Sequence, residues 1–291
     1  MIRFGVAGWD YADWGGTVYP TGGVPRLDRL AYICRFVDVV EINSSFYRPA
    51  APRTAESWLR RTASRGDAFA FTAKLHRSWT HQGDIDSPHD LLDDLDGLRV
   101  LRDGGKLAGL LAQFPQSFHH APRSLDRLRQ ITEMLADWPL VIEVRHAGWQ
   151  TDQAREDFDR LGAAWCVVDQ PRVGRSTATP APRVTSQPGY LRLHGRNAEN
   201  WFREGAGRDA RYDYLYSEDE LNELAQVARE MAGTADELIV VQNNHFRGQA
   251  LVNTLQLKHL VQGEPPLAPE TLVSVYPALA EQTVVERSRL F

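Results

Sequence analysis

The sequence predicts an α/β fold, a single TIM-type (β/α)8 barrel over residues 1–291, and three observations support this prediction. Eight short apolar runs recur along the chain, and each ends near a polar residue or a glycine. Segments with helical periodicity lie between most of these runs. The chain has 291 residues, and about 250 residues is typical of an eight-unit barrel. Strands that alternate with helices pair in parallel through crossover helices, so a closed parallel barrel is expected.

The expected strands are the apolar runs 3–8, 38–43, 68–74, 107–113, 140–145, 163–169, 190–195 and 238–244. The expected helices are 26–36, 54–63, 124–136 and 217–232, with one more beginning near Gly248. Pro25 and Pro52 lie near first turns, and Ser217 precedes an acidic first turn, as is typical of helix starts. Segment 170–189 contains four prolines and no helical period, so the sixth crossover is expected to lack a regular helix.

A doubly wound open sheet is the alternative fold. Its usual cofactor argument depends on a GxGxxG turn after the first strand, and no such turn follows residues 3–8. The barrel is therefore the preferred prediction.

Composition indicates a soluble protein. The formal net charge is −5, from 33 Lys plus Arg and 38 Asp plus Glu, which is not the balance of a general nucleic-acid binder. Cys34 and Cys166 lie in apolar surroundings and are too few for a disulfide framework or a thiolate zinc cluster, so both are expected in the core. No run reaches about 18 apolar residues. With no signal-peptide pattern at the start, a cytoplasmic protein without a membrane partner is expected.

Three charged residues lie within expected strands. Glu41, Glu143 and Arg192 each stand between two apolar residues, which suit the helix-facing side of a barrel strand. The charged side chains are therefore expected to point into the barrel. Further polar residues end the strands and are expected to point to the same place: Asn43, Lys74, Gln113, Arg145, Asp169, His194 and Asn243. Because burying unpaired charges is costly, these groups are expected to pair with one another or with a ligand.

The loops that follow the strands add aromatic and basic residues. Trp9 and Tyr11 follow the first strand and are expected to wall a pocket, and Arg196 follows the seventh. Asn243 and Asn244 end the eighth strand, just before Arg247, Gly248 and Gln249 at the start of a helix. Helix N-termini bind anions, and in barrels this region often holds phosphate. Ordinary caps and turns use the same residue types, so both interpretations stay open.

Seven blocks of the sequence resemble a known family. They are GWDYADWGGTVYP, VVEINSSFYR, KLHRSWTH, LLAQFPQSF, VIEVRHAGW, YLRLHGR and QNNHFRGQALVN. In order and spacing they resemble the blocks of the domain of unknown function 72 family, the YecE-like proteins. The resemblance spans nearly the whole chain and implies a TIM-type barrel, but it supplies no reaction. AQFPQSF departs from the family pattern, in which a second proline commonly follows the first.

The leading functional hypothesis is a hydrolase or an isomerase-type enzyme that needs no cofactor. Glu41 and Glu143 would face each other across the barrel mouth as general acid and base, with Lys74 and His194 beside them. The substrate would be a small anionic molecule, such as a phosphorylated sugar or a nucleotide fragment. The expected substrate-binding residues are Trp9, Tyr11, Asn43, Gln113, Arg145, Asp169, Arg192, Arg196, Asn243, Asn244, Arg247 and Gly248.

Two other functions are consistent with the same residues. In the first, Glu41, Glu143, Asp169 and His194 bind a divalent metal, as in an isomerase or an endonuclease IV-like phosphodiesterase. The cations Lys74 and Arg192 count against this arrangement.

In the second, a non-enzymatic barrel binds nucleic acid or a protein through tryptophans around a basic mouth, and base stacking would suit single strands. Those tryptophans are Trp9, Trp14, Trp79, Trp149 and Trp201. The sequence leaves the oligomeric state open. It also leaves open whether Arg192 forms a structural ion pair with Glu41 or Glu143 or binds an anion.

Overall fold

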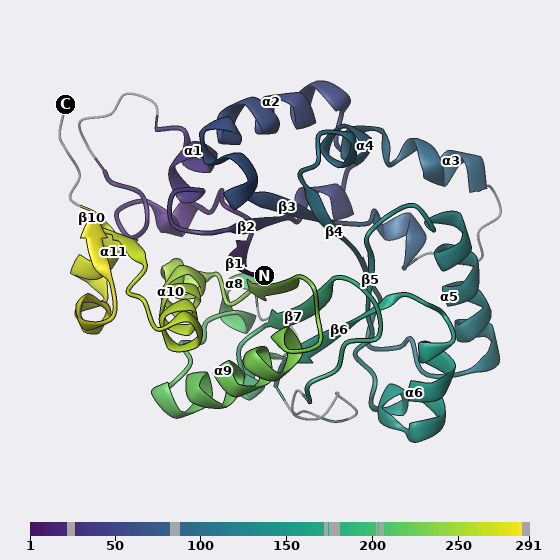
Figure 1. The fold of residues 1–291 in the computed structure, drawn as a ribbon. Coiled ribbons are helices and arrows are strands. Elements are labelled where there is room, and N and C mark those ends of the chain that lie inside the picture. Colours follow the sequence, from purple (N-terminus) through teal and green to yellow (C-terminus); the bar gives the residue numbers. More distant parts are fainter. Residues whose placement is uncertain are drawn as a thin grey trace.

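Eight parallel strands close into a barrel, and helices form an outer ring around it in the computed structural model (Figure 1). The structure describes residues 1–21, 27–81, 88–171, 174, 181–201, 203 and 207–286. The strands are β1 Ile2–Ala7, β2 Val39–Ile42, β3 Ala70–Lys74, β4 Leu107–Gln113, β5 Leu140–Glu143, β6 Ala164–Asp169, β7 Gly189–Leu193 and β8 Leu238–Gln242. All eight expected strands are confirmed, and the TIM-type barrel with them.

The α-helices are α1 Arg29–Ile33, α2 Pro52–Thr62, α3 Pro88–Asp93, α4 Asp96–Asp103, α5 Pro122–Met134, α6 Asp152–Asp159, α7 Ala198–Trp201, α8 Arg208–Arg211, α9 Glu218–Ala232, α10 Gln249–Gln262 and α11 Glu270–Val275. Short 3-10 turns lie at η1 Ala12–Trp14, η2 Ser44–Phe46, η3 Ala63–Ala68, η4 Arg77–Trp79, η5 Ala147–Gln150, η6 Phe246–Gly248 and η7 Pro277–Glu281. Five of these turns directly follow barrel strands. They lie at the carboxyl ends of the strands.

The expected helices are confirmed with shifted ends. Helix α1 is shorter than the periodic segment 26–36, and Pro25 lies outside the described residues. Pro52 is the first residue of α2, and Ser217 caps α9 in a reciprocal arrangement with Glu220, as the acidic start predicts. In the sixth crossover, the described residues of segment 170–189 form no helix, and the rest of that segment lies outside the described residues.

Strand β1 closes the barrel by pairing in parallel with both β2 and β8. The register places Ile2 beside Leu238 and Gly5 beside Val39. A Cβ on Gly5 would lie only 1.8 Å from the Val39 carbonyl oxygen, so β1 can approach β2 this closely only with glycine at that position.

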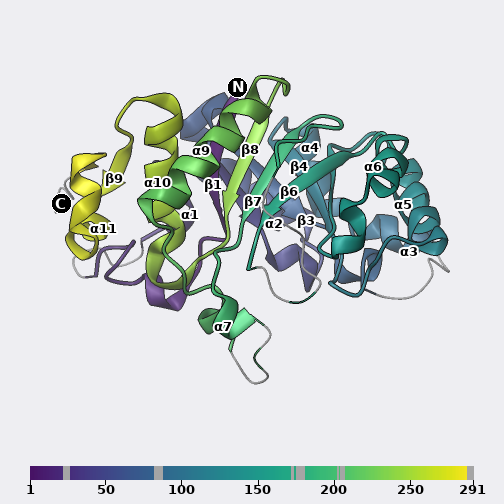
Figure 2. The ribbon, with the colours of Figure 1, turned by 90° about the horizontal axis from the view of Figure 1, so that it is seen from below.

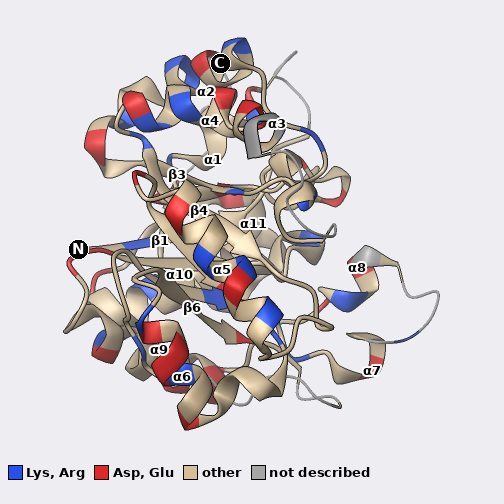
Figure 3. Ribbon diagram, turned by 90° about the vertical axis from the view of Figure 1, so that its right-hand side faces the viewer, with Lys and Arg blue, Asp and Glu red and all other residues tan. Residues whose placement is uncertain are grey.

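The apolar residues form two separate layers. A large cluster lies between the strands and the outer helices, and it includes Cys34. A smaller cluster fills the barrel interior and includes Val39, Val141, Cys166 and Tyr190. Both cysteines are buried core residues, as expected. The charged residues of α2, α5 and α9 lie on the outside of the molecule (Figure 3).

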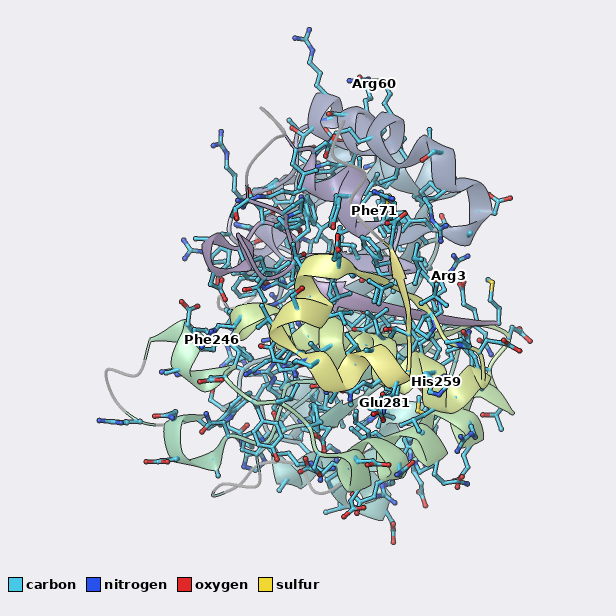
Figure 4. The ribbon with its side chains drawn as sticks, turned by 90° about the vertical axis from the view of Figure 1, so that its left-hand side faces the viewer. Arg3, Arg60, Phe71, Phe246, His259 and Glu281 are labelled. Atoms are coloured by element: carbon cyan, nitrogen blue, oxygen red, sulfur yellow. The ribbon has the colours of Figure 1, made fainter. Side chains whose placement is uncertain are left out.

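The carboxyl ends of the strands lie on the side of the molecule away from the N-terminus. In Figure 4, Phe246, which follows β8, lies on the opposite side of the molecule from Arg3, near the start of β1. Helix α7 stands off the barrel on this same side (Figure 2). Among the described helices, none combines the length and the apolar character needed to cross a membrane.

A small second sheet lies outside the barrel. It consists of β9 Leu267–Pro269 and β10 Val284–Glu286, which pair in parallel beside α11. An ion pair between Arg35 and Glu286 fastens it to the segment after α1.

Candidate functional site

Arg192 joins the two carboxylates of the barrel interior. Its Nε and Nη2 donate to the two oxygens of Glu41 at 3.0 and 2.6 Å, and its Nη1 donates to Glu143 Oε2 at 2.8 Å. All three side chains are at most 1% exposed. The sequence left open whether Arg192 forms an ion pair or binds an anion, and the structure shows that it forms ion pairs with both Glu41 and Glu143.

Arg145 completes the pairing of Glu143. Its Nε donates to Glu143 Oε1 at 2.5 Å, so two guanidinium groups face two carboxylates in this cluster. Burial alone would raise the pKa of Glu143, but Arg145 and Arg192 hold it well below its usual value. Glu143 is therefore ionised at neutral pH and has no proton to give as a general acid.

Tyr190 closes the cluster from below. Its hydroxyl donates to Glu41 Oε2 at 3.0 Å and lies 3.0 Å from the hydroxyl of Thr72. The Tyr190 ring has room because residue 109 is glycine: a Cβ there would lie 3.2 Å from both the Thr72 methyl group and the Tyr190 ring. The cluster therefore has a hydrogen-bonded floor inside the barrel.

His194 lies directly beside these charges and is fully buried. Burial, reinforced by Arg145, lowers the pKa of His194 to about 3, so the ring is neutral at physiological pH. Its Nδ1 lies 2.9 Å from the Asn243 amide nitrogen, and its Nε2 lies 3.2 Å from Arg145 Nη2. A neutral ring adds no charge to a cluster that is already balanced.

Lys74 stands at the end of β3, with its ammonium group beside the cluster. Its Nζ donates to Gln113 Oε1 at 2.8 Å and lies 4.3 Å from the centre of the Phe46 ring. Burial, followed by the charge of Arg192, lowers the pKa of Lys74 to about 7. A substantial fraction of this side chain is therefore a neutral amine near neutral pH.

A pocket of about 90 Å³ opens above these groups. It is lined by Tyr11, Asn43, Tyr47, Lys74, Gln113, Arg192, Tyr212, Asn243 and His245. Six of these residues are predicted site residues, and they come from six different strands or the turns that follow them. The structure thus brings together the strand-end residues whose side chains alternate inward.

A second pocket of about 230 Å³ adjoins the first, and Tyr212 lines both. Gln116, Arg145, Trp201 and Arg211 complete its lining. It therefore combines two guanidinium groups with two aromatic rings, a composition that suits an anionic group next to a flat or apolar one.

Tyr212 lines both pockets and begins the segment 212–216, which is here called the strap. Side-chain amides from α10 and from the segment before it hold the strap's backbone in place. The backbone N–H of Tyr214 donates to Gln249 Oε1 at 2.8 Å, and that of Tyr216 donates to Asn253 Oδ1 at 3.2 Å. Asn244 Nδ2 donates to the Tyr214 carbonyl oxygen at 2.8 Å. Asn244, a predicted substrate-binding residue, lines neither pocket and instead fastens the strap.

The prediction that Asp169 points into the barrel is wrong. Its β6 neighbours Cys166 and Val168 belong to the interior cluster, so Asp169 faces outward. There it accepts hydrogen bonds from the Tyr216 hydroxyl at 2.6 Å and from Arg196 Nε at 3.0 Å. Arg196 is thereby turned away from both pockets, and the pair supports the chain after β7 instead.

At the start of α10, the contacts favour the second of the two open interpretations, a turn into the helix, over an anion site. The backbone N–H of Arg247 donates to Asp13 Oδ2 at 2.5 Å, so a carboxylate of the protein itself occupies that donor. The N–H of Gly248 donates to the His245 carbonyl oxygen at 3.2 Å, and the Gln249 side chain holds the strap. Arg247 and Gly248 both adopt the left-handed conformation and lead the chain from β8 into α10.

The tryptophans do not form a stacking platform at the mouth. Trp14, Trp79 and Trp149 are fully buried, so no base can stack on them. Trp9 packs edge-on against Trp58 with ring centres 5.8 Å apart and lines neither pocket. Of the five predicted stacking residues, only Trp201 lines either of these two pockets.

The predicted metal ligands do not gather. Glu41 and Glu143 bind Arg192, while Asp169 faces the opposite side of the barrel wall. Within the described part of the chain, no three His, Cys, Asp or Glu side chains cluster as a metal site. The four residues proposed as ligands therefore do not fit a shared divalent ion in this arrangement.

The sequence analysis did not predict three residues of the first pocket, nor Gln116 and Arg211 of the second. His245 follows Asn243 by two positions and continues the inward alternation of β8, which the sequence could have revealed; its ring stacks on Tyr11 with centres 4.3 Å apart. Tyr47 lies in the quoted block VVEINSSFYR and is 67% exposed at the pocket. Tyr212 belongs to the strap, where no periodic pattern marks it.

Comparisons with known proteins agree with this architecture. The family described as protein of unknown function DUF72 matches residues 3–273. The UPF0759 protein YunF of Bacillus subtilis (strain 168) is 29% identical over 286 residues, covering 94% of this chain and 99% of that protein.

Two crystal structures of DUF72 family proteins are similar as well. The protein from Thermotoga maritima MSB8 is 31% identical with a TM-score of 0.77, covering 90% of this chain and 99% of that chain. The protein from Enterococcus faecalis V583 is 24% identical with a TM-score of 0.79, covering 90% and 96%. With this sequence match over almost its whole length and the same barrel, the chain belongs to the DUF72 family of proteins of unknown function.

Proposed function

We propose that this protein is an enzyme that performs acid/base chemistry on a small phosphorylated sugar, with the Lys74 amine as its reactive group. The observation that carries the proposal is the place of Lys74 Nζ, in the lining of the pocket and beside a charge cluster that is already balanced.

The balance of the cluster makes Lys74 reactive. Glu41 and Glu143 are matched by Arg192 and Arg145, and His194 is neutral. A protonated Lys74 would add one unmatched positive charge beside a buried cluster that is already balanced, so the neutral amine is favoured. An amine with a pKa of about 7 accepts and returns a proton at physiological pH with little penalty in either direction.

The two carboxylates take a different role from the one the sequence predicts. Each is fully buried, is bound by guanidinium groups and is outside the pocket lining. We therefore assign Glu41 and Glu143 as positioning residues, which hold Arg192 and Arg145 below and beside the substrate.

The linings of both pockets support the substrate class. Asn43, Gln113 and Asn243 line the first pocket, and amide side chains both donate to and accept from sugar hydroxyl groups. Arg145 and Arg211 line the second, and guanidinium groups bind phosphate well. A substrate with a polar end at Lys74 and a phosphate beside Arg211 would fill both pockets.

Binding and turnover can be tested with separate variants. Phosphorylated sugars should raise the melting temperature of the wild-type protein, and Arg211→Ala should remove most of this shift, because Arg211 lines only the phosphate side. Lys74→Met should keep the shift and lose turnover of whichever sugar binds. Arg60→Ala, on the outer surface of α2, is the matched control for loss of an arginine. No shift with any phosphorylated sugar would contradict the proposal.

A further inference from the structure

We propose that Lys74 forms a covalent imine with the carbonyl carbon of an open-chain phosphorylated sugar, an inference that rests on the proposed function. The position of the amine points to this chemistry. Nζ lies in the lining of the first pocket, and the pocket that can hold the phosphate begins across Tyr212.

The surroundings of Nζ leave it exposed to a carbonyl group. Its hydrogen-bond partner is the neutral amide oxygen of Gln113 at 2.8 Å, and the Phe46 ring covers another side at 4.3 Å. Neither group forms an ion pair with the amine. A lysine that lies beside another cation, here Arg192, is the type of amine that enzymes use to form imines.

The other lysines of the chain lie in ion pairs. The chain has three lysines, Lys74, Lys106 and Lys258. Lys106 Nζ lies 3.1 Å from Asp67 Oδ1, and Lys258 Nζ donates to both oxygens of Asp38 at 2.7 and 2.8 Å. These two lysines supply internal controls for any reaction that modifies amines.

The step is balanced without an oxidant or reductant. The lone pair of neutral Lys74 Nζ attacks the carbonyl carbon, and the oxygen gains a proton as the nitrogen loses one. The resulting carbinolamine then expels its hydroxyl group as water, with a proton supplied to that group, while the nitrogen lone pair forms the C=N bond. One amine and one carbonyl compound thus give one imine and one water.

The negative charge of the substrate's phosphate complements the positive charge of the protonated imine. Without substrate, a positive charge on Lys74 is unfavourable because guanidinium groups already match the two carboxylates. A protonated imine would carry that same positive charge. The phosphate of the substrate brings negative charge into the adjoining pocket with Arg145 and Arg211. Substrate binding therefore offsets the excess charge that forms with the imine.

Borohydride trapping tests the proposal on the full-length protein. The probes are dihydroxyacetone phosphate, glyceraldehyde 3-phosphate and ribose 5-phosphate, each mixed with the protein and reduced with sodium borohydride. Hydride adds to the imine carbon, so the protein gains the mass of the probe less one oxygen atom. Peptide mass spectrometry then locates the modified residue. Dihydroxyacetone, which lacks the phosphate, is the matched control for the probe.

The expected result is an adduct at Lys74 with a phosphorylated probe, at least tenfold more than at Lys106 or Lys258. Lys106→Arg and Lys258→Arg should keep this adduct, and Lys74→Arg should abolish it while the variant keeps its circular dichroism spectrum. Absence of any Lys74 adduct, or equal labelling of the three lysines, would overturn the imine.

The outcome also separates this inference from the proposed function. A thermal shift that depends on Arg211, together with turnover that depends on Lys74 but no trapped adduct, overturns the imine and leaves Lys74 as a proton carrier. Neither a shift nor an adduct overturns both.

Discussion

Lys74 and Arg192 share one hydrogen-bond acceptor, the Oε1 atom of Gln113, at distances of 2.8 Å and 3.2 Å. Two cationic side chains thus converge on a single neutral oxygen. The amide can accept from both, but it cannot neutralise either. This arrangement supplies part of the reason that the pKa of Lys74 falls: burial comes first and the charge of Arg192 second.

Replacement of Gln113 by glutamate should reverse this effect. Gln113→Glu keeps the shape of the side chain and adds one negative charge within hydrogen-bond distance of Lys74 Nζ. The charge favours the ammonium form and raises the pKa of Lys74. If the pKa rises by about one unit, the neutral amine at pH 7 and the trapping rate both fall roughly fivefold. Unchanged trapping rates at pH 7 would argue against this electrostatic account.

The trapping rate of the wild-type protein should depend on pH. Protonated Lys74 cannot attack a carbonyl, so the rate should be low well below pH 7 and should rise through a midpoint near the pKa of about 7. The charged and titratable groups that face Lys74 from the other strands and turns are Glu41, His81, Glu143, Arg145 and Arg192. Initial rates of borohydride trapping between pH 5 and pH 9 give the profile, and a midpoint near that of an ordinary lysine would contradict it.

Truncation of Arg192 should be severely destabilising. Arg192→Ala leaves Glu41 without its ion-pair partner and removes one of two partners from Glu143, inside the barrel. Breaking a buried ion pair from one side costs about 3–5 kcal/mol in the free energy of unfolding. Arg60→Ala, at the outer edge of the molecule in Figure 4, should cost less than about 1 kcal/mol. Urea unfolding of both variants checks the difference, and a similar small loss in each would contradict it.

The fold should lose stability in acid. His194 has a pKa of about 3 in the folded protein against about 6.5 in the unfolded chain, so between these values the unfolded chain binds more protons. The free energy of unfolding therefore falls as the pH drops from about 6.5 towards 3. Glu143, whose pKa is also lowered, adds to the loss below about pH 4.5. Urea unfolding at stepped pH should show a shallower dependence between pH 6.5 and 5 for His194→Gln, whereas the exposed His119→Gln should follow the wild type.

The Tyr216 hydroxyl should stabilise the segment after β7. It accepts from the backbone N–H of Gly195 at 2.8 Å and donates to buried Asp169 at 2.6 Å. Tyr216→Phe leaves both partners short of a hydrogen bond and should lower the free energy of unfolding by about 1–3 kcal/mol. Tyr214→Phe, which loses a partly buried bond to Glu220, is the matched control and should cost less. Faster amide hydrogen exchange at residue 195 in the Tyr216 variant alone would locate the effect.

The direction in which strand side chains point was predictable wherever a charged residue interrupts an apolar run. Glu41, Glu143 and Arg192 each have apolar residues on both sides, and the barrel can bury those neighbours against helices only if the charges face inward. In the run that ends at Asp169, both faces are apolar, so no alternation marked its direction. The prediction that Asp169 faces inward then depended only on its position at the end of the strand, and that position does not determine the direction of the side chain.

The other errors come from partners that are far apart in sequence. The Asp13 carboxylate accepts a hydrogen bond from the backbone N–H of Arg247, although the two residues are 234 positions apart in the sequence. No local sequence pattern indicates such a contact. The burial of Trp14, Trp79 and Trp149 likewise depends on tertiary packing. A tryptophan in a loop suits a core and a binding surface equally well.

The way the strap is attached determines which residues of the pocket walls can change. Asn244, Gln249 and Asn253 bind main-chain atoms of Tyr214 and Tyr216. The side chains of Asp213, Tyr214 and Tyr216 also form hydrogen bonds, so these three positions are constrained. Arg211 and Tyr212 line the pockets, so substitutions at these two positions would change the pocket walls and leave the hydrogen bonds of residues 213–216 in place. Under the proposed function, such substitutions would change which substrate binds and would leave the Lys74 amine in place.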